Sequence, residues 1–135
     1  TGIAALRRDG FASMQARLPN ALLTTRPVKF SGEYLFVNAA TAGGNLRVEC
    51  LDEQGGVIPP FTADNCRPFI GDNTRAMIRW ETSDSLAALR GRPVRFRFFM
   101  TKGDLYSFWV SHSAKGESRG FLAAGGAGIS GAWDR

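Results

Sequence analysis

The chain has 135 residues, the size of one domain whose core is large enough to fold without disulfide or metal support. Its 44% hydrophobic and 21% charged residues are typical of a soluble globular protein, and no apolar run approaches the ~20 residues of a membrane span. Seventeen basic residues, mostly arginine, and twelve acidic residues give a net charge of +5. Because the basic residues form no cluster and carry no nucleic-acid-binding motif, we expect neither nucleic acid nor a membrane as a partner.

In chain order, the sequence begins with an alternating segment and shows neither the charged nor the apolar region of a signal peptide, so none is expected in these residues. Asp9-Gly10 then favours a tight turn between two strands. Short extended runs separated by turn residues continue through most of the chain. They are expected as strands at residues 2–8, 11–18, 22–30, 33–40, 45–53, 57–62, 74–81, 94–101 and 105–111.

The longest such pattern is RPVRFRFFMTKGDLYSFWVS, residues 92–111. Two alternating runs flank Lys102-Gly103-Asp104, and the short glycine-containing link predicts a hairpin in the centre of the sheet. On its second strand, Trp109 is expected to share a face with Leu105 and Ser107.

Two loops are also predicted from turn residues. Residues 41–44 should turn the chain between two strands, and residues 63–73 should form a longer loop rich in Asp, Asn, Pro and Gly. Residues 112–135 contain six glycines and show no periodicity, so they are expected to run over the surface or to fray.

These features together predict an all-β fold, specifically a two-sheet antiparallel β-sandwich of jelly-roll or lectin type with about ten strands. We expect a single domain, with residues 1–111 as the sandwich core and residues 112–135 as a glycine-rich C-terminal tail.

The two cysteines, Cys50 and Cys66, are candidates for a disulfide that would contribute ~3 kcal/mol by closing a loop. Two buried free thiols are an equally good interpretation, because cysteine also behaves as a small hydrophobic residue. Their spacing matches neither a metal site nor a redox motif.

Evidence for catalysis is weak. The single histidine, His112, has no nucleophile motif around it and is expected in an exposed loop. A pair of carboxylates such as Glu49 and Glu81 could support glycoside hydrolysis. However, arginines alternate with both, which favours a cross-strand ladder of ion pairs. Its expected members are Arg47 with Glu49 and Arg79 with Glu81, joined by Arg95 and Arg97.

The predicted loop at residues 63–73 carries oxygen ligands that suit Ca²⁺, namely Asp64, Asn65, Asp72 and Asn73. Their spacing matches no EF-hand, and Asx residues are common in turns for reasons of backbone hydrogen bonding. Asp64 and Asp72 are therefore weak candidates for a structural calcium site.

Sugars bind to flat aromatic faces surrounded by polar side chains. Trp109 is the best candidate for such a platform, with Arg95, Arg97, Asp72 and Asn73 as polar partners. The alternative is that the tail or a neighbouring domain covers Trp109. Trp80 follows the apolar face of its strand and is expected in the core.

Several segments together resemble a known domain type. They are LRRDGF at 6–11, TTRPVKFSGEYLFVNA at 24–39, CRPFIGDNTRAMIRW at 66–80, residues 92–111 and the closing SRGFLAAGGAG. The chain is similar over nearly its whole length to the C-terminal β-sandwich module of secreted bacterial proteins that resemble glycoside hydrolase family 32.

In that family a β-propeller carries the catalytic carboxylates, so the resemblance transfers no catalytic residue to this chain. It implies an extracellular or periplasmic accessory module that binds a polysaccharide or oligosaccharide. We expect no cofactor other than the structural calcium considered above. A structural domain that braces an absent catalytic β-propeller is the first alternative. A stand-alone glycan-active enzyme is the second.

Overall fold

The structure, a computed structural model, describes residues 2–120 and residue 133. These residues form six strands and one 3-10 helix, and every strand pair is antiparallel. The elements are β1 (Met14–Ala16), β2 (Ala21–Thr24), β3 (Tyr34–Leu51), β4 (Phe69–Met77), η1 (Ala87–Leu89), β5 (Arg95–Thr101) and β6 (Gly103–Ser111). The expected all-β class is confirmed. Among the described residues, no helix has the length and apolar character needed to cross a membrane.

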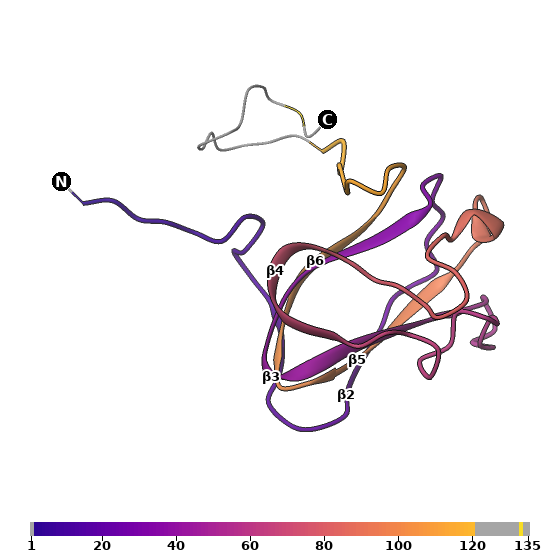
Figure 1. Ribbon diagram of the computed structural model, residues 1–135, viewed down its shortest axis with the longest axis horizontal. Coiled ribbons are helices and arrows are strands. Elements are labelled where there is room, and N and C mark those ends of the chain that lie inside the picture. Colours follow the sequence, from indigo (N-terminus) through magenta and orange to yellow (C-terminus); the bar gives the residue numbers. More distant parts are fainter. Residues whose placement is uncertain (1, 121–132, 134–135) are drawn as a thin grey trace.

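The six strands belong to one sheet, which curls until it is nearly barrel-shaped (Figure 1). The expectation of about ten strands in two separate sheets is not what the described residues show. The difference arises because the expected strands at residues 33–40 and 45–53 are joined in β3, and because the expected strands at residues 2–8 and 57–62 are not formed.

The predicted hairpin at residues 92–111 is wrong. β5 and β6 do not pair with each other, and both pair with β3 in nearly one continuous register. Asn45 lies opposite Thr101, and Ala40 lies opposite Asp104. β6 therefore continues β5 along the same edge of β3, and the Lys102-Gly103 link bends this long strand without reversing it.

The bend folds this long strand over the core. The ring centroids of Phe98 and Phe108 are 5.1 Å apart. Ten residues of a straight strand would separate them by roughly 33 Å. Positive φ values at Lys102 (46°) and Gly103 (156°) allow the chain to turn this corner.

The partner strand β3 bends at the same level, so the predicted turn at residues 41–44 is also wrong. Its first half pairs with β6 and its second half with β5, while β4 lies along its other edge. Gly44 permits the close crossing, because a Cβ atom there would lie 1.5 Å from the Thr101 carbonyl oxygen.

The core lies inside the curled sheet. Its largest fully buried side chains come from β3, β5 and the segment after β4, and they include Val37, Val48, Phe96, Phe98, Ile78 and Trp80. Burying each such side chain stabilises the fold by ~1.5–3 kcal/mol. Trp80 is 1% exposed and donates its indole N–H to the Val48 carbonyl at 3.1 Å, which confirms its predicted place in the core.

Two further predictions need correction. The predicted loop at residues 63–73 is partly a strand, because β4 begins at Phe69 and pairs with β3. Asp9-Gly10 lies in a turn, with the Gly10 N–H donated to the Arg7 carbonyl at 3.0 Å, but no hairpin forms around it. The exposed residues 2–6 instead project from the sheet (Figure 1).

Candidate binding surface

Trp109 lies on β6, directly opposite Phe36 of β3. The two rings are stacked, with centroids 5.7 Å apart and planes 15° from parallel. The Trp109 indole N–H donates a hydrogen bond to the Gly116 carbonyl at 3.1 Å. Phe36 is buried and Trp109 is half-buried, so the tryptophan ring is fixed in orientation while part of it meets solvent.

A β-bulge decides which side chains share the outer face with Trp109. The register shifts between Asn38 and Ala39, so Tyr106 has no residue opposite it on β3. Leu105 is consequently turned into the core, where it is 4% exposed. The prediction that Leu105 shares the face of Trp109 is wrong for this reason.

Arg7 crosses this outer face from the N-terminal segment. Its guanidinium donates hydrogen bonds to the Asn38 side chain at 2.5 Å and to the Ala39 carbonyl at 3.0 Å, and it pairs with Asp72. The same group lies 4.6 Å from the centroid of the Tyr106 ring, a cation–π contact. Arg7 therefore joins β3, β4 and β6 on their outer side.

We call this region the Trp109 surface, and its members lie on four segments of the chain. They are Arg7, Phe36, Asn38, Asp72, Tyr106 and Trp109. Sequence reasoning missed Arg7 and Tyr106. The bulge that turns Tyr106 outward has no clear sequence signal, and nothing distinguishes Arg7 from the other arginines of the chain.

Of the predicted polar partners, Asp72 and Asn73 reach this part of the sheet. Asp72 lies opposite Ala40, four positions along β3 from the residue that faces Trp109, which is roughly 13 Å in a strand. The side chain of Asn73 is exposed and accepts a hydrogen bond from the Arg75 N–H at 2.7 Å.

Arg95 and Arg97 lie in the other half of the sheet, beyond the bend. Arg97 faces Glu49 in the register and pairs with it at 3.0 Å, so this step of the predicted ion-pair ladder is present. Glu81 pairs with Arg67 and not with Arg79, which pairs with Asp84. Arg95 is half-buried, and within the described residues its Nε atom has no hydrogen-bond partner.

The calcium candidates are not gathered in one loop. Asp64 is exposed in the segment before β4, whereas Asp72 is on β4 and is paired with Arg7. Within residues 2–120, no group of three or more His, Cys, Asp or Glu side chains is positioned to hold a metal ion.

Cys50 and Cys66 are free thiols, both buried. Burial raises the pKa of Cys66 to about 11, although a hydrogen bond from the Val48 N–H works in the opposite direction. Burial and the neighbouring Cys66 also raise the pKa of Cys50. Both groups are therefore neutral near pH 7, and neither is a reactive thiolate.

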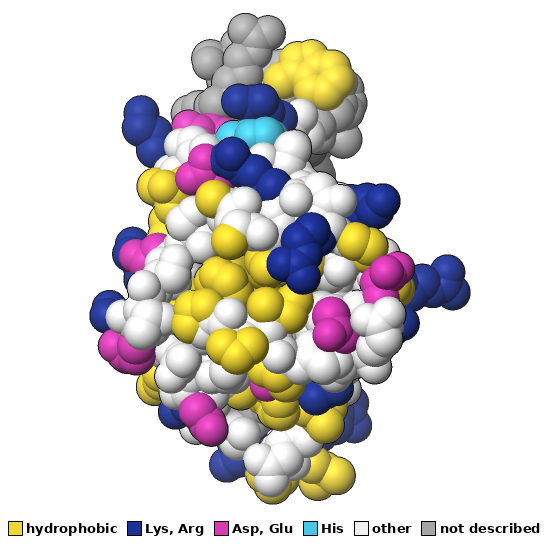
Figure 2. All heavy atoms as spheres, turned by 90° about the vertical axis from the view of Figure 1, so that its right-hand side faces the viewer, with side chains coloured by type: hydrophobic (Ala, Val, Ile, Leu, Met, Phe, Trp, Pro, Cys, Tyr) yellow, Lys and Arg dark blue, Asp and Glu magenta, His cyan; other side chains and the backbone are white. Residues whose placement is uncertain are grey.

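Charges are spread over the molecule, as the sequence indicated. Figure 2 shows Lys and Arg side chains around the rim of one face, with hydrophobic side chains near its centre. Beside the Trp109 surface, a hydrogen bond with the Ser113 side chain lowers the pKa of the Glu117 carboxyl. His112 is exposed, and its Nε2 atom is 3.1 Å from the Ser31 hydroxyl.

Comparisons with protein families, curated proteins and solved structures found no match for this chain.

Proposed function

We propose that this chain is a non-catalytic carbohydrate-binding module and that a polysaccharide or oligosaccharide binds at the Trp109 surface. The observation that carries the proposal is the half-buried Trp109 ring, held by Phe36 on one side and by Gly116 at its N–H. A ring fixed in this way loses little side-chain entropy when a sugar stacks on it.

Polar groups along the same surface supply directional contacts. The Asp72 side chain is 70% exposed, and Arg7 holds it in place from one side. An extended sugar chain that stacks on Trp109 and runs along β3 would meet Tyr106 and then Asp72. The positions of β3 that face Trp109 and Asp72 are four residues apart, roughly 13 Å along the strand, and this spacing favours an oligosaccharide over a single sugar as ligand.

Arg95 and Arg97 have no part in this form of the proposal, because they lie beyond the bend. In its wider form, the proposal assigns the chain a lectin-like β fold and an extracellular or periplasmic location. The chain would then be the accessory module of a protein that resembles glycoside hydrolase family 32, with a catalytic β-propeller as the neighbouring domain. Calcium has no role in the binding step.

Affinity electrophoresis tests the proposal directly. The chain is run through native gels that contain neutral or acidic polysaccharides, beside Trp109→Ala and, as a matched control, Trp133→Ala. Trp133 is 55% exposed and lies outside the Trp109 surface. We expect Trp109→Ala to weaken retardation at least tenfold and Trp133→Ala to leave it unchanged.

The net charge of +5 would by itself slow the chain in gels of acidic polysaccharide. Trp109→Ala keeps this charge, so retardation that persists in the variant would come from charge and would count against the proposal. A lack of retardation by any polysaccharide would rule out the proposal. Thermal unfolding of each variant checks that loss of binding is not loss of folding.

A further inference from the structure

A second surface lies at the outer edge of the sheet. β1 pairs with β6, and β2 pairs with β5, both on the side away from β3. They are thus two parts of one edge strand, interrupted by residues 17–20. Among the described residues, no strand pairs with the other side of β1 or β2.

The hydrogen-bond pattern identifies the groups that face outward from this edge. The Thr25 N–H is donated to the Phe96 carbonyl at 2.9 Å, toward β5. Antiparallel pairs alternate between bonded and non-bonded residues, so Leu23 and Ala21 also direct their backbone groups toward β5. Leu22 and Thr24 therefore direct their N–H and C=O groups away from the sheet.

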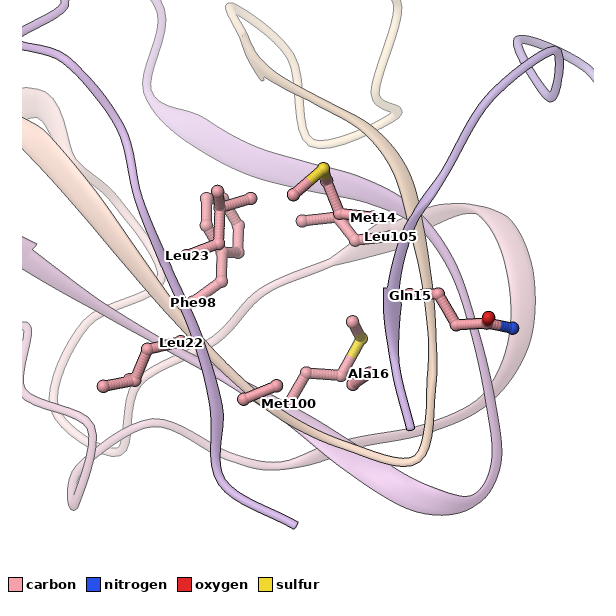
Figure 3. Close-up of a pocket in the computed structure, with 9 residues that line it drawn as sticks. Met14, Gln15, Ala16, Leu22, Leu23, Phe98, Met100 and Leu105 are labelled. Carbon is pink, nitrogen blue, oxygen red and sulfur yellow. The ribbon is translucent and has the colours of Figure 1, made fainter. Parts of the chain in front are cut away.

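An apolar cavity of about 60 Å³ opens beside this edge, between β1 and β2. Its lining is Met14, Gln15, Ala16, Ala21, Leu22, Leu23, Phe98, Met100 and Leu105. Figure 3 shows the Gln15 amide, the only polar side chain of the set, directed away from the other labelled residues. The cavity is roughly twice the volume that one water molecule occupies in the liquid, enough for a small alkyl group.

The edge is also positively charged. Residues 10–32 contain Arg17, Arg26 and Lys29 but no Asp or Glu. All three basic residues are exposed. The nearest carboxylate on the neighbouring strand is that of Asp104, which accepts a hydrogen bond from the Ser13 hydroxyl at 2.8 Å.

We propose that this edge binds an extended segment of a partner protein in which apolar and acidic residues alternate. The segment adds as a strand to β2 through Leu22 and Thr24 and places one apolar side chain in the cavity. Strand addition takes its affinity from backbone hydrogen bonds and its specificity from pockets for alternate side chains, and this edge offers both. Acidic residues on the segment complement Arg17, Arg26 and Lys29.

The experiment uses the acetylated, amidated heptapeptide Glu-Val-Glu-Leu-Glu-Val-Glu, the matching peptide with Lys in place of Glu, and a form with Pro at the centre. Binding is measured by calorimetry, and amide exchange is followed by NMR. We expect the acidic peptide to bind at least tenfold more tightly than the other two. It should slow exchange at the Leu22 and Thr24 amides and leave the protected Leu23 amide unchanged.

Three variants separate the parts of the proposal. Leu22→Pro removes the outward N–H at a position where an edge strand tolerates proline, and it should weaken binding at least tenfold, whereas Leu22→Val should not. Ala21→Leu fills the cavity and should weaken binding while the protein stays folded. Arg17→Glu should weaken binding of the acidic peptide and strengthen binding of the Lys peptide.

Several results would overturn the proposal. They are no binding of the acidic peptide at millimolar concentration, equal binding of the acidic and Lys peptides, and binding without slower exchange at Leu22 and Thr24. Because the Trp109 surface is on another part of the molecule, Trp109→Ala should leave peptide binding unchanged. The two proposals can therefore fail separately.

Discussion

Glu49 and Arg97 lie opposite each other on β3 and β5, and the Glu49 Oε1 atom is 3.0 Å from Nη1 of Arg97. The Glu49 side chain is only 8% exposed, whereas that of Arg97 is 32% exposed. Glu49 also accepts a hydrogen bond from the Ala63 N–H at 3.4 Å. This carboxylate therefore connects β3 and β5 to the segment between β3 and β4.

Glu49→Ala should lower the free energy of unfolding by about 2 kcal/mol, because it leaves a partly buried guanidinium and a backbone N–H without their acceptor. Glu81→Ala is the matched control. Glu81 pairs with Arg67 on the surface, where both side chains are more than half exposed, and its loss should cost under about 1 kcal/mol. Urea unfolding measures both values. Equal losses would show that burial of Glu49 adds nothing.

Substitution of the two glycines in the bend of β3, Gly43 and Gly44, should lower the stability of the protein by very different amounts. Gly44→Ala places a Cβ atom 1.5 Å from the Thr101 carbonyl oxygen, so the strands must separate. We expect a loss of more than about 3 kcal/mol or failure to fold. Gly43→Ala meets nothing within 4 Å and costs only the strain of its positive φ, about 1 kcal/mol. Thermal unfolding distinguishes these cases, and a Gly44→Ala protein as stable as Gly43→Ala would contradict the close crossing.

Removal of the Arg7 side chain should detach the N-terminal segment from the sheet. Arg7→Ala leaves the Asn38 side chain, which is 1% exposed, with fewer partners, and we expect a loss of about 1–3 kcal/mol. Arg7→Lys should restore little of the lost stability, because one ammonium group cannot reproduce the set of contacts made by the planar guanidinium. The exposed Arg26→Ala is the control. Limited proteolysis should cut the first ten residues of both Arg7 variants faster, and no change would refute the anchoring role.

The buried thiols predict a decline in stability at high pH. The pKa of Cys66 is about 11 in the folded protein, above the ordinary value of 9.0 that applies in the unfolded chain. The stabilisation that the neutral, buried Cys66 thiol contributes is complete below about pH 9. It is lost as the pH rises toward 11, because in that range this thiol ionises only in the unfolded chain. The slope approaches about 1.4 kcal/mol per pH unit for each thiol.

Urea unfolding at pH 8, 9 and 10 measures this slope, and Cys66→Ala should make it shallower. Other groups that titrate in this range contribute equally to both proteins and cancel in the comparison. Identical slopes would show that Cys66 ionises as readily in the folded protein as in the unfolded chain. Iodoacetamide gives a second readout, since both thiols should react at pH 8 only after unfolding.

The alternation of side chains was enough to predict the all-β class and the place of Trp80 in the core. It could not show whether two alternating runs fold back on each other or continue in line. Gly43-Gly44 and Lys102-Gly103 have the composition of hairpin turns, and in isolation they would favour them. Here the two links lie opposite each other in paired strands, so both strands bend together, and this depends on contacts distant in sequence.

The candidate surface was predictable only in part for a similar reason. Trp109 was identified from its residue type and its side of the strand. The bulge at Tyr106 then moved Leu105 inward, and a single extra residue of this kind reverses the alternation beyond it. The contacts of Arg7 depend on where the N-terminal segment crosses the sheet, which no local pattern records.

The long bent pairing of β3 with β5 and β6 also constrains when the protein can fold. Glu49 and Arg97 are 48 residues apart, so the central pairing requires the ordering of a large loop before its contacts form. During synthesis, β3 emerges long before its main partner and has only β4 to pair with until residues 95–111 follow. A nascent chain halted before that point exposes the inner face of β3, and it is at this stage that the protein would depend most on chaperones.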